Sequence, residues 1–324
     1  MRAIVCREYG TPEDLVLDEL PDPTAGPGQV VVRVRAAAVN YPDVLLIAGK
    51  YQIKVPPPFT PGSEMAGDVL AVSDGVDLRP GDRVSATAFV GGFAEQILVD
   101  ARGLTPIPDG VDYADAAAFG VTNRTAYYTL RTVAPVKPGD WVVVLGAAGG
   151  VGLAAVDIAV LMGARVIAAA SGADKLEVCR QRGAAECIDY DREDLKARLK
   201  EITGEAGAHV VLDPVGGRYA EPALRGLGRG GRFVTLGYAS GEIPKIPLNL
   251  VMLKGITLVG MEIRTFATDY PDAVERDDAE LRQLFAEGKL RPYIGARFPL
   301  EQAPAALRYV ADRKAVGKVV IDVA

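Results

Sequence analysis

The sequence predicts an α/β protein that combines a doubly wound parallel sheet with a separate β-rich region. From residue 123 onward strand-like and helix-like runs alternate, which indicates strands joined in parallel by helices. Before residue 123, short β-branched runs are separated by turns rich in proline and glycine. With 324 residues, of which 49% are apolar, the chain is long enough for about two domains.

Residues 1–122 predict the β-rich region. The runs at 29–39 and 64–73 are apolar and β-branched, and the segments around them include KVPPPFTPG and LRPGD. Many short strands divided by such turns are typical of a small, partly closed barrel.

Residues 123–262 predict the parallel sheet. Its strand-like runs are WVVVLG, RVIAAAS, ECIDY, HVVLDPVG and RFVTLG, with helix-like runs between them. The remaining residues, 263–324, return to mixed character, with helix-like stretches at 277–288 and 301–313 and a strand-like tail.

A glycine-rich segment after the first of these strands predicts a nucleotide site. The run WVVVLGAAGGVG ends a strand at Gly146 and opens a helix at three further glycines; we call Gly146–Gly152 the glycine turn. Glycine lets the backbone approach a diphosphate, and the helix N-terminus favours its negative charge. A purely structural turn is the alternative, because Ala147 stands where a strict G-x-G-x-x-G has glycine. Its place at the first turn from strand to helix favours the nucleotide.

Charge and histidine content exclude several classes of function. The chain has 42 acidic and 36 basic residues, a net charge of −6, which argues against a nucleic-acid partner. The single histidine, His209, lies in a strand-like run, which disfavours zinc enzymes and histidine relays.

Cysteine and apolar patterns indicate a cytoplasmic protein outside the membrane. Cys6, Cys179 and Cys187 are odd in number and lack metal-ligand spacing, as expected of a reduced protein. The longest apolar region, 151–170, is interrupted by charged residues, so a membrane span is not expected. The N-terminus shows no secretory signal.

The end of the second parallel strand bears on which nicotinamide cofactor is bound. Enzymes that select NAD carry an acidic residue there, whereas RVIAAAS ends at Ser171 without one. The missing carboxylate removes repulsion toward a 2′-phosphate, and Lys175 offers a positive charge. Alternatively, Ser171 to Asp174 is a helix-capping pattern and Lys175 is a solvated helix residue.

Seven segments together carry a resemblance to a known family. They are AAAVNYPDVLLIAGKY (36–51), PFTPGSEMAGDV (58–69), VDLRPGDRV (76–84), GAAGGVG (146–152), DPVGG (213–217), GGRFVTLGYASG (230–241) and GKVVI (317–321). In this order and spacing the chain resembles the zinc-independent NADPH:quinone oxidoreductases of the medium-chain dehydrogenase/reductase superfamily.

The resemblance implies a Rossmann-type doubly wound parallel sheet plus a GroES-like β-rich catalytic domain. The expected division is 1–122 for the catalytic domain, 123–262 for the NADP-binding domain and 263–324 for the return. It also implies an active cleft between the domains and a homodimer. Relatives carry Ala-Ala before the glycines, so Ala147 fits the subfamily.

The resemblance further implies a site without metal. Zinc-dependent members carry a cysteine at the position of Asn40 and a histidine at that of Ser63, while Glu64 is retained. The lobe with four closely spaced cysteines is also missing from this sequence.

NADPH is the cofactor that the resemblance implies. Relatives use a serine, a lysine and a tyrosine at the positions of Ser171, Lys175 and Tyr190 for the 2′-phosphate. The other expected cofactor contacts are Thr125, Ala148, Gly149, Gly150, Val151, Gly237, Tyr238 and, for the adenosine phosphate, Lys318. A charged residue flanking a strand is an equally good explanation of Lys318.

Asn40, Asp43 and Tyr51 are the expected catalytic residues, on the same resemblance. Asn40 and Asp43 have a structural alternative, a turn around Pro42, and Tyr51 can equally be a packing residue. Such a site positions cofactor and acceptor, and the reduced quinone takes its protons from solvent or a nearby hydroxyl.

Three functions therefore stay open. The first is an NADPH-dependent reductase of quinones. The second reduces the activated C=C bond of an enone, enal or enoyl thioester. The third is an NADPH-binding scaffold with little turnover.

Overall fold

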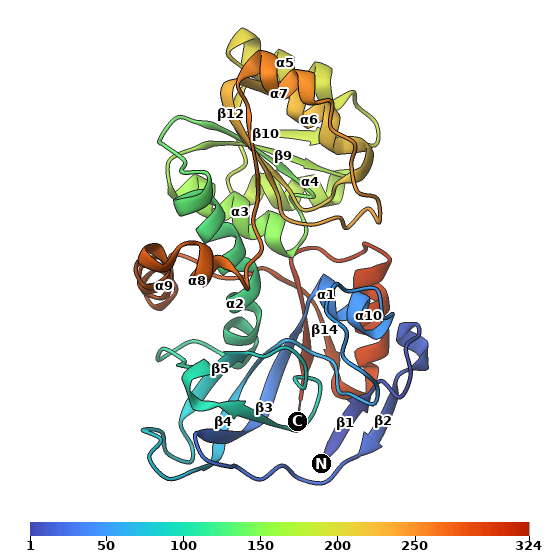
Figure 1. The fold of residues 1–324 in the computed structure, drawn as a ribbon, viewed down its shortest axis with the longest axis vertical. Coiled ribbons are helices and arrows are strands. Elements are labelled where there is room, and N and C mark those ends of the chain that lie inside the picture. The colour runs from blue at the N-terminus through green and yellow to red at the C-terminus, as the bar shows by residue number, and fades with distance from the viewer. Residues whose placement is uncertain (324) are drawn as a thin grey trace. The chain divides into compact units, whose positions relative to one another are not determined.

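The computed structural model describes residues 1–323, which form two compact units (Figure 1). The first unit contains Met1–Val121 and the described part of Arg291–Ala324, and the second contains Thr122–Leu290. The division falls inside α2 (Tyr113–Tyr128).

A seven-stranded mixed sheet forms the centre of the first unit. Its order is β14-β15-β3-β4-β5-β7, with β6 also paired to β3. The strands are β3 (Gln29–Val39), β4 (Glu64–Val72), β5 (Arg83–Thr87), β6 (Gln96–Asp100), β7 (Leu104–Pro106), β14 (Ile294–Pro299) and β15 (Lys318–Asp322). The shorter elements are β1 (Arg2–Val5), β2 (Val16–Glu19), α1 (Tyr41–Ile47), α10 (Ala303–Ala311) and the 3₁₀ turns η1 (Pro12–Asp14), η2 (Ala101–Gly103) and η6 (Leu300–Gln302).

Pairing in this sheet brings distant parts of the chain together. Strand β15 pairs antiparallel with β3, with Val319 opposite Val39, and β4 pairs with the other side of β3. The residues at the ends of these strands, Asn40, Glu64 and Lys318, therefore meet at one edge although up to 278 residues separate them.

A six-stranded parallel sheet forms the centre of the second unit. Its order is β10-β9-β8-β11-β12-β13, so that the first strand in sequence lies in the middle. The strands are β8 (Trp141–Leu145), β9 (Arg165–Ala170), β10 (Glu186–Asp189), β11 (Ala208–Asp213), β12 (Leu227–Thr235) and β13 (Thr257–Gly260). This is the strand order 3-2-1-4-5-6 of a Rossmann fold, which confirms the predicted fold class.

Helices cover both faces of the parallel sheet, with α3 and α4 on one side and α5 to α7 on the other (Figure 1). They are α3 (Gly150–Leu161), α4 (Ala173–Gln181), α5 (Leu195–Thr203), α6 (Ala220–Gly226), α7 (Leu248–Lys254), α8 (Phe266–Asp269) and α9 (Pro271–Ala286). Shorter turns are the π-helical η3 (Thr129–Val133) and the 3₁₀ turns η4 (Gly204–Ala206) and η5 (Gly217–Tyr219). Every residue of β8 is buried, as expected of a central parallel strand.

The return to the first unit begins at Arg291 rather than at residue 263. The difference arises because α8 and α9 are attached to the end of α2. Phe266 of α8 is buried and stacks on Tyr128, with ring centroids 3.9 Å apart and an interplanar angle of 7°. Helix periodicity predicts that α9 exists, but its long-range hydrogen bonds to the end of α2, such as Tyr127 to Glu280 at 2.6 Å, decide the unit to which it belongs.

Candidate functional site

The glycine turn joins β8 to α3. Gly146 has a φ of +58°, a conformation that side chains other than glycine rarely adopt. A Cβ on Gly152 would lie 2.2 Å from the carbonyl oxygen of Gly146, so no other residue fits this turn without moving the backbone.

The first turn of α3 presents donors for an anion. Its first i→i−4 hydrogen bond runs from the N–H of Leu153 to the carbonyl of Gly149, at 2.8 Å. The N–H groups of Gly150, Val151 and Gly152 precede that bond, as is usual at a helix N-terminus. Ala148 beside them is buried. Such an end fits a diphosphate.

Two of the three residues that are expected to bind a 2′-phosphate lie directly after neighbouring strands. Ser171 follows β9 and Tyr190 follows β10, and the N–H of Tyr190 donates to the carbonyl of Ala170 at 3.3 Å. The N-cap of α4 is Gly172, so the structure does not use Ser171 as the helix cap. Lys175 lies in the first turn of the same helix.

An aromatic stack continues this edge of the sheet. The ring of Tyr190 stacks on Tyr219, with centroids 4.1 Å apart. The Tyr219 hydroxyl donates to Asp191 at 2.7 Å, and Arg218 donates to the same carboxylate at 2.8 Å. The stack therefore has a defined position beside Ser171.

The carboxyl ends of β11 and β12 form the next part of the edge. The loop after β11, Pro214–Gly217, is bonded to the segment after β12 that contains Gly237 and Tyr238. Backbone N–H groups of Ala239 and Ser240 donate to the carbonyls of Pro214 and Val215 at 3.1 and 2.8 Å. Tyr238 is exposed. Gly237 and Tyr238 thus share an edge with the glycine turn, where α/β sheets bind ligands.

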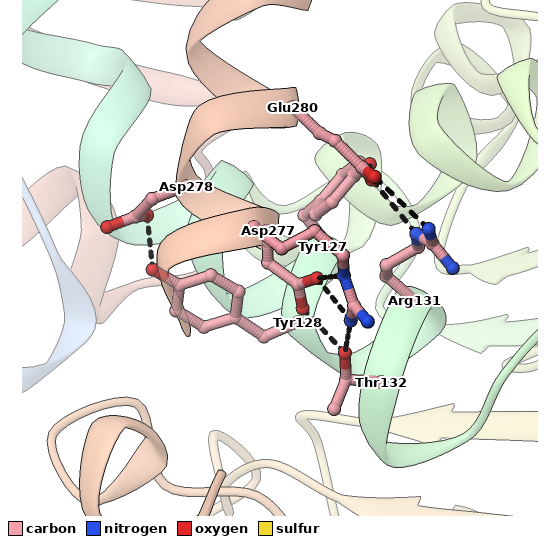
Figure 2. Close-up of polar contacts among 8 residues, drawn as sticks. Tyr127, Tyr128, Arg131, Thr132, Asp277, Asp278 and Glu280 are labelled. Atoms are coloured by element: carbon pink, nitrogen blue, oxygen red, sulfur yellow. Dashed lines mark hydrogen bonds and ion pairs between the residues drawn. The ribbon is translucent and has the colours of Figure 1, made fainter. Parts of the chain in front are cut away.

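Thr125 lies in the half of α2 that polar contacts with α9 hold in place. Figure 2 shows the side chains of α9 facing Tyr127, Tyr128 and their neighbours. The bonds include Tyr127 to Glu280 at 2.6 Å, Tyr128 to Asp278, and Thr132 to Asp277 at 2.6 Å. Thr125 is itself buried, and its carbonyl accepts a bond from the hydroxyl of Thr129.

Three buried polar side chains meet in the first unit; we call Asn40, Glu64 and Lys318 the charged cluster. The Lys318 ammonium donates to the carboxylate of Glu64 at 2.9 Å and to Oδ1 of Asn40 at 2.7 Å. Glu64 also accepts bonds from Nδ2 of Asn40 at 2.9 Å and from the backbone N–H of Val121. All three side chains are almost fully buried.

The N–H donors of Lys318 and Asn40 in the charged cluster are bonded to protein oxygens. A lysine has three N–H donors, and those of Lys318 face Glu64, Asn40 and the carbonyl of Val39 at 3.4 Å. The Lys318 ammonium therefore binds protein oxygens, which argues against the expected contact with the adenosine phosphate. Both amide hydrogens of Asn40 are also used, on Glu64 and on Ser63 at 3.2 Å.

Asp43 is fully buried in the first turn of α1. Its Oδ2 accepts the backbone N–H of Asn40 at 2.7 Å, so the turn around Pro42 exists as the structural alternative predicted. Its Oδ1 has no hydrogen-bond partner among the described residues. Burial raises the pKa of Asp43 from 3.8 to about 7.

Replacing Asp43 with Asn is expected to change how stability depends on pH. Between about pH 4 and 7 the unfolded chain carries Asp43 ionised while the folded chain keeps it protonated. The folded state then binds more protons, so Asp43 makes stability fall as pH rises through this window. The free energy of unfolding of the wild type, minus that of Asp43→Asn, should decrease from pH 4 to 7. Urea unfolding across this range measures it, with the exposed Asp74→Asn as control, and parallel curves would contradict it.

Tyr51 and Tyr41 are both partly buried. Tyr51 packs against the core of the first unit, and its ring is tilted toward Phe89 with centroids 6.3 Å apart. Tyr41 begins α1 directly after Asn40. Tyr51 therefore contributes to packing, and Tyr41 is the residue next to Asn40 along the chain.

No group of three or more His, Cys, Asp or Glu side chains within residues 1–323 is arranged to hold a metal ion. His209 has a structural contact, since its Nδ1 accepts the N–H of Trp141 at 2.9 Å. Within the same residues, no helix combines the length and the apolar character needed to cross a membrane.

Two buried carboxylates, Glu64 in the first unit and Asp213 in the second, hold their surroundings in place although the sequence does not predict this role for them. From the sequence Glu64 is only a retained residue, and its partner Lys318 comes from the far end of the chain, so no local pattern pairs them. Asp213 has a local signal, because an aspartate directly before Pro-Val-Gly-Gly is typical of a side chain that caps a turn.

Comparisons with known proteins agree with this architecture. Residues 26–109 match the alcohol dehydrogenase GroES-like domain, and residues 150–277 match the family described as zinc-binding dehydrogenase. A quinone oxidoreductase-like protein 2 homolog of Nematostella vectensis is 38% identical over 99% of this chain and 88% of its own length.

Solved structures show the same relationship. A probable oxidoreductase of Mycobacterium abscessus is 37% identical, with a TM-score of 0.89 over 99% of this chain and 98% of that one. Escherichia coli quinone oxidoreductase complexed with NADPH is 29% identical, with a TM-score of 0.92 over 99% and 100% of the two chains. On this likeness along its whole length, the chain belongs to the quinone oxidoreductase family of the medium-chain dehydrogenase/reductase superfamily.

Proposed function

We propose that this protein is an NADPH-dependent oxidoreductase that transfers a hydride to a quinone. The observation that carries the proposal is the carboxyl edge of the parallel sheet, where the glycine turn lies beside a strand end without an acidic residue. The likeness to an E. coli quinone oxidoreductase solved with NADPH supports it.

Each part of that edge suits one part of the cofactor. The N–H groups at the start of α3 suit the diphosphate. Ser171, Lys175 and Tyr190 suit the 2′-phosphate, because they offer a hydroxyl, a cation and a second hydroxyl without a repelling carboxylate. Gly237, Tyr238 and Thr125 are assigned to the nicotinamide side. NADPH supplies the hydride when it is bound.

The first unit supplies the residues for the acceptor. Lys318 and Glu64 fix both ends of the Asn40 amide, so its orientation is set before any substrate binds. Asp43 and Tyr51 follow it along the chain. A quinone is a strong hydride acceptor whose reduced oxygens take protons from solvent. The site therefore needs to position the cofactor and the acceptor, and it does not need to relay protons.

A panel of acceptors tests the proposal. NADPH oxidation is measured with quinones, enones, enals and enoyl thioesters, and the panel is repeated with NADH. We expect turnover with quinones and a preference for NADPH. Activity confined to enones, enals or enoyl thioesters would contradict the quinone as acceptor and favour the reduction of an activated C=C bond. Tight NADPH binding without oxidation by any acceptor would favour the scaffold.

The same panel tests the cofactor assignment with Ser171→Asp. A carboxylate at this strand end repels a 2′-phosphate and accepts a bond from a ribose hydroxyl, so the NADPH-to-NADH ratio of kcat/KM should fall by about tenfold or more. Ser171→Ala is the matched control, because it removes the hydroxyl without adding charge. An unchanged ratio in Ser171→Asp would remove Ser171 from the 2′-phosphate site.

We further propose that the protein forms a homodimer through α7 and β13. Strand β13 ends the parallel sheet, and one of its two sides has no strand beside it among the described residues. Nearby Leu248, Met252 and Leu253 are 70%, 75% and 60% exposed, an unusual exposure for such side chains. A second copy related by a two-fold axis covers both features at once.

Light scattering tests the dimer. The wild type should have a mass of twice 34.2 kDa, and Met252→Glu should shift it toward the monomer. Ile53→Glu is the control, since it places the same charge on an exposed apolar residue of the first unit. A wild-type mass of 34.2 kDa would contradict the proposal.

A further inference from the structure

Asp213 ends β11 at the level of the glycine turn. Strand β11 lies beside β8 in the sheet, with Leu212 opposite Val144, so Asp213 is next to the end of β8. Its side chain is fully buried. An aspartate at such a place needs a reason, because burying a carboxylate is costly unless it is hydrogen-bonded.

One oxygen of Asp213 fixes the loop that follows. Its Oδ1 accepts the backbone N–H groups of Val215 at 2.9 Å and of Gly216 at 2.7 Å. Gly216 and Gly217 both have left-handed backbone conformations, with φ of +68° and +59°. The carboxylate therefore selects one conformation for a segment that glycine leaves permissive.

Val215 transmits this position to the glycine turn. Its Cγ2 lies only 2.7 Å from the place that a Cβ on Gly146 would occupy, so the valine fills the space that this glycine leaves open. Gly146 in turn contacts Gly152 closely through its carbonyl oxygen. A continuous chain of contacts thus runs from the carboxylate to the start of α3.

The second oxygen of Asp213 helps to distinguish this arrangement from an ordinary turn. Oδ2 is buried without a hydrogen-bond partner among the described residues, and so is the hydroxyl of Thr235. Thr235 is the residue opposite Asp213 in the pairing of β11 with β12. A partnerless buried carboxylate oxygen lowers stability, and such a group is found where function requires it although packing alone does not favour it. The Thr235 hydroxyl bonds to no residue of the 214–217 loop, so it carries no part of this argument.

We propose that Asp213 is a positioning residue of the nucleotide site, which sets the glycine turn through Val215. The proposal rests on the proposed binding of NADPH at that turn. Asp213 acts on the cofactor through the 214–217 loop and touches no reacting atom. Its effect therefore falls on cofactor binding, whereas hydride transfer from bound cofactor and the KM for the acceptor stay near their wild-type values.

Direct titration of NADPH by its fluorescence tests this with four variants. Asp213→Leu removes the acceptor and should weaken NADPH binding by about tenfold to a hundredfold, the cost of a small misplacement of binding groups. Asp213→Asn keeps an oxygen that accepts both N–H groups and should restore binding to within about threefold. Val215→Ala removes the contact with Gly146 and should weaken binding to an intermediate degree. Thr235→Val, which removes the neighbouring hydroxyl and no loop contact, is the matched control and should bind as the wild type.

The outcomes separate this inference from the proposed function. A wild type that does not bind NADPH contradicts the proposed function. A wild type that binds, together with Asp213→Leu within twofold of it or Asp213→Asn as weak as Asp213→Leu, overturns the role of Asp213. If Asp213→Leu does not fold, Val215→Ala and Asp213→Asn decide, and wild-type binding in Val215→Ala overturns the proposal. A raised KM for NADPH with an unchanged kcat and acceptor KM supports it.

Discussion

Replacing Lys318 with Met is expected to lower the free energy of unfolding by about 3–5 kcal/mol, because it leaves a buried carboxylate without its cation. Glu64 is 1% exposed and Lys318 is 3% exposed, so water cannot take the place of the ammonium. The Asn40 amide also loses the bond to its oxygen. Urea unfolding monitored by circular dichroism measures the loss.

Two further variants show whether the loss comes from the burial of the charge. The double variant Glu64→Gln with Lys318→Met removes both charges and should be more stable than Lys318→Met alone. Arg297→Met breaks the ion pair between Arg297 of β14 and Asp322 of β15, whose side chains are 54% and 43% exposed. That exposed pair should cost about 1 kcal/mol or less. A Lys318→Met loss no larger than that of Arg297→Met would show that burial contributes nothing.

Replacing Gly152 with Ala is expected to abolish useful NADPH binding, with an affinity loss of about a hundredfold or more. The new Cβ would lie 2.2 Å from the carbonyl oxygen of Gly146 and 2.8 Å from the Cα of Ala147, and both are backbone atoms. Relief of the clash therefore requires the start of α3 to move away from β8. The donors intended for the diphosphate move with it.

Fluorescence titration of NADPH measures that loss, and circular dichroism checks that the variant is folded. Gly103→Ala is the matched control, because a Cβ there meets only a methyl group of Val99 at 3.8 Å. It should bind NADPH as the wild type does. Unchanged affinity in folded Gly152→Ala would show that the glycine turn does not touch the cofactor.

The parts of the fold that rest on local pattern could be predicted from the sequence. Alternating strands and helices predict the doubly wound parallel sheet, whereas the order of its strands is seen only in the structure. The end of β9 at Ser171 without an acidic residue is equally local. These features can be predicted because each depends on residues that are close in sequence, within about one turn or one strand of each other.

The remaining features depend on contacts between distant segments. GKVV predicts a strand flanked by a lysine, but only the pairing of β15 with β3 brings Lys318 to Glu64. Helix periodicity predicts α9, but its hydrogen bonds to Tyr127 and Tyr128 of α2 assign it to the second unit. Asp213 is an intermediate case, since its turn is local and its contact with the glycine turn through Val215 is not.

The place of β15 has a consequence for the order in which the protein folds during synthesis. The second unit is made from one continuous segment, Thr122–Leu290, and can form as soon as that segment has left the ribosome. The first sheet must wait, because β15 separates β14 from β3 and is translated after the whole of the other unit. Until then residues 36–39 of β3 have an open edge, which is prone to pair with other chains, and Glu64 lacks the Lys318 ammonium. Nascent chains are therefore most exposed to aggregation in the half that they begin first and complete last.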